Sequence, residues 1–349
     1  MIRSRGELTI RRSAIAHNWR TLAQQAPSTQ CAAVVKANAY GVGVEPVAQS
    51  LWAEGCRTYY VASLEEGVAL RTDLPDAEIC LFDGYPPEWA DPVEQLALRP
   101  VLNRPDEVLR YRQRYPGGGI WQIDTGMNRL GLSLTEAAEL MEAGSAPDRV
   151  LMHLAVAEEP QHAVTRTQLA AAARWRERWP AIPLSLGNTA GCQLGSGAAS
   201  DECRVGIGLF GLNPGVGSPP LQPALRLRGR ILQQRRVARG ETVSYGATWR
   251  APRDTTLATV GLGYADGLPR GLGNRARLTL AGHPADVVGV VTMDYLMVDA
   301  GPTGVPESEE WVTVFEQAGE LEALARVVDT IPYELLTRLG PRIERRHVD

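Results

Sequence analysis

Short apolar segments alternate with amphipathic stretches through roughly the first 210 residues of the chain. The segments are four to six residues long and rich in Val, Ile, Leu and Ala, a pattern typical of strands buried in a parallel sheet. Eight of them lie at residues 32–36, 58–62, 78–82, 100–103, 120–124, 150–155, 183–186 and 203–207. Eight strands alternating with helical stretches predict an α/β fold, a (β/α)8 TIM-like barrel.

The stretches between these segments carry apolar residues at helical spacing, with Arg, Glu or Gln on the opposite face. Helices are predicted at 45–55, 64–73, 133–144 and 162–179, with a further helix at 12–25 ahead of the first strand. Ser133 followed by Glu136 matches the pattern of a capping box, which fixes where one of these helices begins.

The pattern changes after Pro214. A loop rich in Gly and Pro at 215–223 precedes alternating, strand-like segments at 224–236, 255–263, 276–280, 285–291 and 296–299. Helical stretches at 321–328 and 333–339 are expected to end this part. The chain is therefore predicted to contain a barrel at 1–214 and a mainly β domain at 215–349, and its first few residues are candidates for pairing with the second domain.

Composition narrows the range of functions. The net charge of −4 and the absence of a strong basic stretch argue against nucleic acid as a partner. No apolar run approaches the roughly 20 residues that span a bilayer, and the N-terminus has no secretory pattern, so no membrane partner is expected. The five scattered cysteines form no CxxC pair, which predicts no metal site and a reducing cytoplasm.

One residue stands out against this composition. Lys36 is the only lysine among 36 basic residues, and arginine cannot replace lysine where an amine must lose its proton. Barrel enzymes place their chemistry at the carboxyl ends of the strands. The ends of the predicted strands carry the residues with the most reactive or most polar side chains, namely Lys36, Asp124, His153, Asn188, Thr189 and Arg204.

These residues indicate a particular cofactor. The stem of Lys36 follows an apolar run, and burial lowers the pKa of an amine so that it can form a Schiff base. The loops after the last two strands of such barrels often bind phosphate; here they offer the Thr189 hydroxyl and the backbone near Gly206. A Schiff-base lysine beside a phosphate site predicts pyridoxal 5'-phosphate.

Several ordered motifs resemble one family, the pyridoxal-phosphate alanine racemases. The segment 34–41 (VVKANAYG) is similar to the lysine signature of that family, and the similarity continues through 124–131 (DTGMNRLG) and 204–207 (RVGI). In the second half it includes 243–249 (VSYGATW), 263–267 (GYADG) and 292–294 (TMD). The resemblance covers nearly the whole chain and implies an isomerase that interconverts L-alanine and D-alanine, supplying D-alanine for peptidoglycan.

The resemblance also implies a role for each site residue. Lys36 would carry the cofactor and act as the base on one face of the substrate Cα, with Tyr245 as the base on the other face. In this family the tyrosine comes from the second subunit, which implies a homodimer with shared active sites. The other residues would bind either the cofactor or the substrate. The substrate would be bound by Arg129, Tyr264 and Met293. The cofactor would be bound by Tyr40, Arg129, His153, Asn188, Thr189, Arg204, Gly206 and Ile207.

The chemistry agrees with these roles. Racemisation removes a proton on one face and returns it on the other, so it needs two bases. Tyrosine has a reference pKa near 10 and works as a base only beside cations or donors such as His153 and Arg204. An arginine at the pyridine nitrogen keeps its own proton, which leaves the ring a weaker electron sink and should suppress transamination.

Two departures from the family bear on how Arg129 and the substrate are held. Many members have a carbamylated lysine at the position of Gln122, which holds the arginine equivalent to Arg129. Here Gln122 itself or a bound anion such as chloride would have to hold Arg129. Arg338 occupies the position of a family tyrosine near the C-terminal Pro341-Arg342 pair, which leaves serine or another small amino acid open as substrate.

Other functions stay open as alternatives. One is a racemase of the same family that prefers serine. Others are a decarboxylase on the same barrel, which would not need Tyr245 as a second base, and a non-catalytic cofactor-binding protein, which would not need the second domain.

Overall fold

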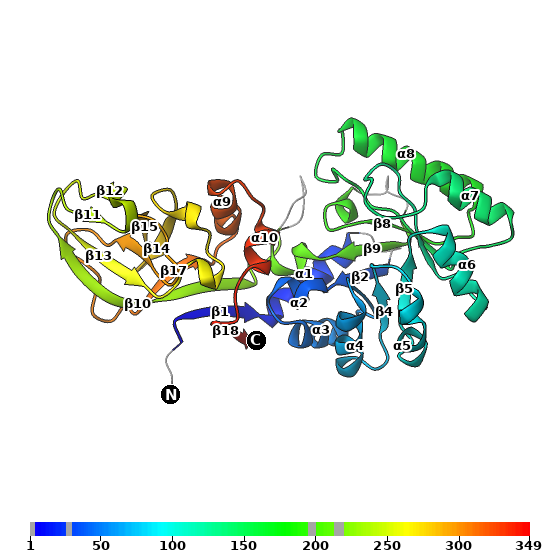
Figure 1. The fold of residues 1–349 in the computed structure, drawn as a ribbon, viewed down its shortest axis with the longest axis horizontal. Helices are drawn as coiled ribbons and strands as arrows, with labels where there is room; N and C mark the ends of the chain where they lie inside the picture. The colour runs from blue at the N-terminus through cyan, green and yellow to red at the C-terminus, as the bar shows by residue number, and fades with distance from the viewer. Residues whose placement is uncertain (1–3, 26–29, 195–199, 213–219) are drawn as a thin grey trace. The chain divides into compact units, whose positions relative to one another are not determined.

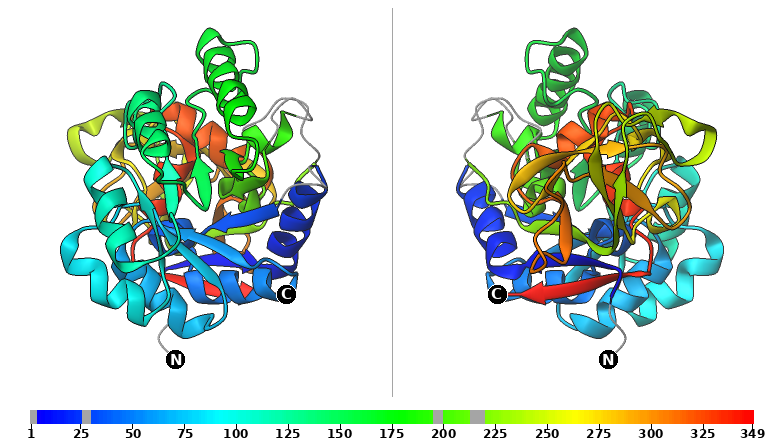
Figure 2. Two further views of the ribbon diagram at one scale, coloured as in Figure 1. Left: turned by 90° about the vertical axis from the view of Figure 1, so that its right-hand side faces the viewer. Right: turned by 90° about the vertical axis from the view of Figure 1, so that its left-hand side faces the viewer.

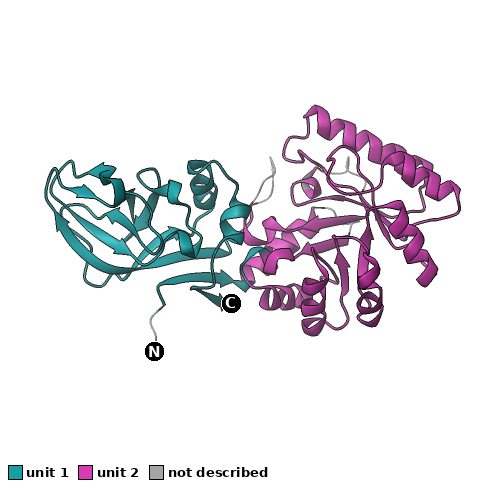
Figure 3. Cartoon of the chain, viewed as in Figure 1, with its two compact units in different colours: residues 1–12, 40–42, 223–349 teal, residues 13–39, 43–222 magenta. Residues whose placement is uncertain are grey.

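The computed structural model describes residues 4–25, 30–194, 200–212 and 220–349. The chain forms two compact units (Figure 3). One unit contains residues 13–39 and 43–222, and the other contains residues 1–12, 40–42 and 223–349. The predicted boundary between residues 214 and 215 lies in the segment 213–219, outside the described residues.

Eight parallel strands close into a barrel in the order β2 to β9, as the sequence predicts (Figures 1 and 2). The barrel closes where β2 pairs with β9, with Cys31 opposite Cys203 and Ala32 opposite Arg204. Its strands are β2 (Gln30–Val34), β3 (Thr58–Val61), β4 (Glu78–Leu81), β5 (Arg99–Leu102), β6 (Ile120–Gln122), β7 (Arg149–Leu151), β8 (Leu184–Gly187) and β9 (Glu202–Val205).

Amphipathic helices surround these strands (Figure 2). Ser133 and Glu136 form the predicted capping box at the start of α7, because Ser133 Oγ accepts from the Glu136 N–H and the Ser133 N–H donates to Glu136. The helices are α1 (Arg12–Gln24), α3 (Val44–Ala53), α4 (Leu64–Asp73), α5 (Ala90–Gln95), α6 (Pro105–Arg114), α7 (Leu134–Glu142) and α8 (Ala163–Arg178), with the short turn α2 (Lys36–Tyr40) after β2.

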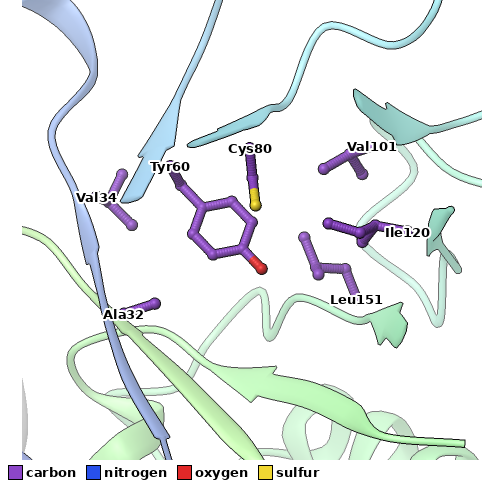
Figure 4. Packing of buried hydrophobic residues seen from close by; sticks show 7 residues of the cluster. All are labelled: Ala32, Val34, Tyr60, Cys80, Val101, Ile120 and Leu151. Carbon is purple, nitrogen blue, oxygen red and sulfur yellow. The ribbon is translucent and has the colours of Figure 1, made fainter. Parts of the chain in front are cut away.

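The barrel interior is filled with side chains. Figure 4 shows one cluster of this core, in which Tyr60 of β3 packs among smaller residues from five other strands: Ala32, Val34, Cys80, Val101, Ile120 and Leu151. All are buried. Because the interior is packed, the space for chemistry lies at the ends of the strands.

The other unit is built on an antiparallel sheet of eight strands in the order β13-β16-β15-β14-β17-β10-β1-β18. Both ends of the chain contribute to it, because β1 pairs antiparallel with β10 and parallel with β18. The strands are β1 (Gly6–Arg11), β10 (Leu225–Val237), β13 (Thr255–Val260), β14 (Arg277–Leu280), β15 (His283–Val288), β16 (Leu296–Asp299), β17 (Trp311–Phe315) and β18 (Ile343–Val348); β11 (Thr242–Val243) and β12 (Trp249–Arg250) form a separate pair.

The expectation that helical stretches end the chain is wrong. The helices α9 (Glu320–Val327) and α10 (Pro332–Thr337) are present, but β18 follows them. Its sequence IERRHV has too few apolar residues to predict a strand, and backbone pairing with β1 determines its conformation. Within the part of the chain that the structure describes, no helix has both the length and the apolar character that crossing a membrane requires.

Candidate active site

Lys36 lies in an unusual turn rather than at the end of a strand, where the sequence placed it. Strand β2 ends at Val34, and residues 37–40 of α2 all have positive φ, between 52° and 60°. Left-handed backbone costs an L-residue about 1–2 kcal/mol. Four such residues in a row form a strained turn, and strain of this kind is concentrated at functional sites.

Neighbouring polar groups hold the turn in place. The Ala37 N–H donates to Glu66 Oε1 at 2.7 Å, and the Asn38 side-chain oxygen accepts from the Val44 N–H at 2.8 Å. Glu66 is fixed in turn by the Ala62 N–H, which donates to Oε2 at 2.8 Å. The first turn of α4 therefore sets the backbone that presents Lys36.

The amine of Lys36 is placed where it can lose its proton. Burial lowers its pKa, and the nearby charge of Arg129 lowers it further, while Glu66 and Asp83 oppose this effect. The Nζ atom lies 5.7 Å from the centre of the Phe82 ring. A lysine with a lowered pKa beside a second cation is a competent nucleophile and base.

Asp124 shapes the loop that carries Arg129. One carboxylate oxygen accepts from the N–H groups of Gly126 and Met127, both at 2.8 Å, and the other accepts from Asn128 at 2.8 Å. The loop returns to β6 through the Asp124 N–H, which donates to the Leu132 carbonyl at 2.8 Å. Asp124 thus positions the backbone of the loop that carries Arg129. Its place at the end of an apolar strand was the sign of this role in the sequence.

Gln122 does not bond Arg129. Its side-chain nitrogen donates to the Leu130 carbonyl at 2.8 Å, so it stabilises the loop backbone next to Arg129. Among the described residues, the guanidinium of Arg129 has no hydrogen bond or ion pair. The side chain is exposed, and a small pocket at this point is lined by Gln122, Ile123, Asp124, Met127, Arg129, Leu130 and His153. The expectation that Gln122 holds Arg129 directly is therefore not met.

Arg204 points into the barrel, opposite Ala32, and only 4% of its surface is exposed. Its Nη1 donates to the Ser185 carbonyl at 2.8 Å and to Ser185 Oγ at 2.6 Å, and its Nη2 donates to the Met152 carbonyl at 2.8 Å. The guanidinium is thereby fixed on two sides.

His153 lies beside Arg204 and is neutral. Burial, with the charges of Arg204, Arg129 and Lys36, lowers the pKa of His153 to about 3. Because a guanidinium only donates, the 3.4 Å contact between Arg204 Nη2 and His153 Nδ1 makes Nδ1 the acceptor and leaves the ring proton on Nε2. Burial is the larger cause of this lowered pKa, and the three neighbouring cations add to it.

Thr189 connects the loops after β8 and β9. Its buried hydroxyl oxygen accepts from the Gly206 N–H at 3.1 Å and from the Gly208 N–H at 3.4 Å. Asn188 stabilises the first of these loops by accepting from the Gly191 N–H at 2.8 Å. Gly206 precedes the 3-10 helix η4 (Ile207–Phe210), so backbone N–H groups and a hydroxyl gather in one place.

Three further predicted residues belong to the β-rich unit. Tyr264 and Met293 lie on adjoining loops, since the Tyr264 N–H donates to the Thr292 carbonyl at 3.0 Å. A Cβ on Gly263 would lie 2.3 Å from the Met293 carbonyl oxygen, so only glycine permits this approach. Tyr245 begins the 3-10 turn η5 (Tyr245–Ala247) and is 75% exposed.

Arg342 ties the same two loops together, a role that the sequence motifs alone did not assign. Its Nε donates to Asp266 at 2.8 Å, and its Nη1 donates to Asp294 at 2.7 Å. Asp266 is buried and also accepts from the Gly263 N–H at 2.9 Å. Asp266 lies in the motif GYADG and Asp294 in the motif TMD, so the sequence already contained the two partners of Arg342.

Tyr333 is a second residue that the sequence did not reveal. Its ring packs against that of Tyr40, with centroids 6.0 Å apart. Arg338, the residue aligned with the family tyrosine, instead forms an ion pair with Glu334 at 2.8 Å. The aromatic neighbour of Tyr40 thus comes from an earlier position on α10 than the alignment indicated.

The barrel end therefore combines a half-buried lysine of lowered pKa, two further cations, a neutral histidine, and a group of backbone N–H groups and a hydroxyl. Together with the fold, this set is that of a barrel enzyme with a reactive lysine at the carboxyl end of its strands.

Comparisons with known proteins identify the family. The model of the alanine racemase N-terminal domain matches residues 10–214, and that of the alanine racemase C-terminal domain matches residues 224–347. The chain is 40% identical to the alanine racemase of Methylobacterium sp. (strain 4-46), over 98% of this chain and 97% of that protein. It is 42% identical to the alanine racemase of Rhodospirillum rubrum, over 97% of this chain and 95% of that protein. The chain belongs to the alanine racemase family, which confirms the resemblance found in the sequence.

Solved structures agree. The crystal structure of alanine racemase from Bartonella henselae with covalently bound pyridoxal phosphate has a TM-score of 0.92 and 35% identity, over 99% of this chain and 100% of that chain. Biosynthetic alanine racemase from Pseudomonas aeruginosa has a TM-score of 0.90 and 31% identity, over 99% and 100%.

Proposed function

We propose that this chain interconverts L-alanine and D-alanine with pyridoxal 5'-phosphate by a two-base mechanism. One observation carries the proposal: the only lysine of the chain has a lowered pKa and lies within the electrostatic reach of Arg129 and His153. Family membership supplies the reaction type, and the lysine supplies the group that such a reaction requires.

The residues present fit this cofactor. The positive charges of Arg204, Arg129 and Lys36, which add to the effect of burial on His153, would attract a phosphate and a substrate carboxylate. The donors around Thr189 and the N–H groups at the start of η4 suit a phosphate. The groups assigned to the cofactor are Lys36, Tyr40, Arg129, His153, Asn188, Thr189, Arg204, Gly206 and Ile207.

The proton transfers follow from two side chains. Pyridoxal phosphate, which Lys36 would hold between turnovers, would supply an electron sink that acidifies the hydrogen on the substrate Cα once the substrate amine has displaced the lysine. Lys36 Nζ takes or gives this proton on one face, and Tyr245 Oη does so on the opposite face. Arg129, Tyr264 and Met293 hold the substrate, and His153 orients Arg204.

Arg204 controls which reaction follows. Its guanidinium donates and does not release its proton, so a pyridine nitrogen that accepts from it stays unprotonated. Electron withdrawal is then moderate, which favours return of the proton to Cα over transfer of the amino group. Replacing Arg204 by Glu should increase side transamination, measured as pyruvate formed from L-alanine; an unchanged ratio of pyruvate to racemised alanine would contradict this role.

A homodimer with shared active sites accounts for the exposure of the second base. Tyr245 is 75% exposed and Met293 54%, and Tyr264 is also exposed. Surfaces of this kind on a β-rich unit are typical of contacts with another chain. A second copy would place its Tyr245 over the Lys36 of the first, across a two-fold interface.

Mixing two inactive variants tests this arrangement. Lys36→Ala and Tyr245→Phe subunits, mixed at random, should recover about a quarter of wild-type activity, because half of the dimers are mixed and one of their two sites is intact. Recovery is absent if both bases come from one chain.

Arg129 needs a partner other than Gln122. We assign this role to a bound anion such as chloride. Activity should then rise with chloride and fall when chloride is replaced by a large organic anion at constant ionic strength. A rate independent of chloride would exclude this assignment.

The direct test of the function uses purified protein in D2O. L-alanine should lose its optical rotation and exchange its Cα hydrogen, whereas a non-catalytic binding protein shows neither change. L-serine measured in parallel distinguishes the serine-preferring alternative, which predicts the larger kcat/KM for serine.

The cellular role we assign is the supply of D-alanine for peptidoglycan in the cytoplasm. Relatives include both the catabolic alanine racemase of Agrobacterium fabrum (strain C58 / ATCC 33970), at 38% identity, and the biosynthetic enzyme of Pseudomonas aeruginosa. Growth of a D-alanine auxotroph without added D-alanine, when this chain is expressed, tests whether it can fill the biosynthetic role.

A further inference from the structure

A chain of buried polar side chains runs through the barrel interior and ends at Arg204. It begins at Arg149, which donates to Glu202 Oε2 at 2.7 Å. Glu202 Oε1 in turn accepts from Ser185 Oγ at 2.7 Å, and Ser185 Oγ accepts from Arg204 Nη1 at 2.6 Å. Ser185 is completely buried, and Glu202 is only 2% exposed.

The directions of these hydrogen bonds are determined by chemistry. Arg204 can only donate, so the Ser185 oxygen is the acceptor and its hydrogen is free to point to Glu202. Tyr60 also donates to Glu202 Oε1, at 2.7 Å. Three donors, from Arg149, Ser185 and Tyr60, thus fix the orientation of the Glu202 carboxylate.

The charges of the chain alternate. Glu202 lies between two cations, Arg149 in direct contact and Arg204 one hydroxyl away. The guanidinium groups of the buried Arg204 and the partly buried Arg149 would repel each other without an anion between them. Glu202 therefore stabilises the charge of Arg204 and, through Ser185, its orientation.

We infer that Glu202, acting through the Ser185 hydroxyl, is a positioning residue that influences the electronic state of the bound cofactor by fixing the orientation of Arg204. The inference rests on the proposed function, in which Arg204 donates to the pyridine nitrogen. Its consequence concerns the balance of reactions: a well-fixed Arg204 keeps the ring unprotonated and racemisation dominant over transamination.

The chain provides a matched control. Glu78 also binds Arg149, with Nη2 at 2.9 Å from its Oε2, but it has no contact with Ser185 and its side chain is 25% exposed. Glu202→Gln and Glu78→Gln thus each remove one negative charge from Arg149. Only the first removes the charge linked to Arg204.

The experiment compares these two variants and Ser185→Ala as holoenzymes, with two readouts. One is the absorbance spectrum of bound pyridoxal phosphate; the other is pyruvate formed per L-alanine racemised, where pyruvate reports transfer of the amino group to the cofactor. Glu202→Gln and Ser185→Ala should each raise the pyruvate ratio about tenfold, the effect of losing one charge-assisted hydrogen bond, and should change the spectrum. Glu78→Gln should change neither.

The double variant Ser185→Ala/Glu202→Gln should resemble the single variants, because both act through one connection. A wild-type ratio and spectrum in Glu202→Gln would overturn the inference, as would equal effects of Glu202→Gln and Glu78→Gln. If Glu202→Gln does not fold, Ser185→Ala, which only removes a hydroxyl, decides the matter. Failure of the wild type to racemise alanine would instead contradict the proposed function, which keeps the two failures distinct.

Discussion

The residues assigned to the active site occupy two contrasting environments. In the barrel, Arg204 is 4% exposed, donates to two carbonyls and a hydroxyl, and is part of a buried network. In the β-rich unit, Tyr245 is 75% exposed, and Met293 and Tyr264 also lie at the surface. The barrel residues are held by their own chain, whereas the loops of the β-rich unit are well fixed but end in free side chains.

This difference separates two ways of building a site. Barrel residues contribute to stability as well as chemistry, since their hydrogen bonds form part of the core. The exposed residues contribute little to the stability of their own unit, so changes there should affect activity alone. The following variants test this contrast, from the largest expected effect to the smallest.

Lys36→Ala should abolish racemisation, with a loss of at least about 10⁴-fold, because it removes both the attachment point of the cofactor and one base. Two quantities are measured: the rate of L-alanine racemisation, and the absorbance of the protein after it is incubated with pyridoxal phosphate and the unbound cofactor is removed by dialysis. No other side-chain amine exists in the chain to take its place. Retention of a covalently bound cofactor in the variant would disprove the assignment.

Tyr245→Phe should reduce racemisation about 10³-fold, the contribution of one acid–base group, while the free energy of unfolding stays within about 0.5 kcal/mol of the wild type. Both numbers are needed: kinetics give the loss of racemisation, and urea unfolding gives the free energy of unfolding.

Arg204→Ala is the matched barrel variant and should lose about 3 kcal/mol of stability as well as activity, because it leaves buried acceptors unpaired. Equal stability losses would remove the contrast.

His153 should make the protein less stable as the pH falls. The folded protein keeps His153 neutral down to a pKa of about 3, whereas the unfolded chain takes up the proton near pH 6.5. The unfolded state therefore binds more protons between these values, and stability contributed above pH 6.5 is lost on the way to pH 3, on the order of 5 kcal/mol. Urea unfolding of His153→Asn across this range should show a flatter profile than the wild type; parallel profiles would show that His153 titrates normally.

Ser133→Ala should cost about 1 kcal/mol of stability by removing the capping box of α7, with no change in kcat/KM. The residue lies on a barrel helix but has no contact with the proposed site, so it measures stability loss alone. A fall in activity without loss of stability would show that stability and chemistry are coupled further from the site than the comparison implies.

Most of the barrel could be predicted from the sequence, because the spacing of apolar residues and the local capping motif indicate the same strands and helices there. Each buried strand produces its own apolar run, and Ser133 with Glu136 marks a helix start by local hydrogen bonds alone. The strand β18 was missed because its pairing with β1 joins residues more than 300 positions apart, and its own pattern is polar. Long-range backbone pairing leaves little trace in the residues concerned.

The candidate site shows the same division. Residue type and position were enough to select Lys36, His153 and Arg204 as site residues, since such side chains at the ends of barrel strands have few roles other than chemistry. The turn at Lys36 was not foreseen, because alanine does not favour left-handed backbone and the contacts that hold the turn, with Glu66 and with the Val44 N–H, appear only in the folded chain. Contacts between side chains distant in the sequence, such as Tyr40 with Tyr333, likewise appear only in the folded chain.

The left-handed turn after Lys36 limits how this segment can vary in evolution. Replacement of Ala37, Asn38 or Ala39 by glycine relieves strain and eases folding, but it loosens the backbone beside the reactive amine. Replacement by Val, Ile or Thr keeps the backbone stiff at a greater conformational cost. Selection for stability and selection for catalysis therefore oppose each other at these three positions, and neutral drift there is confined to small, unbranched side chains.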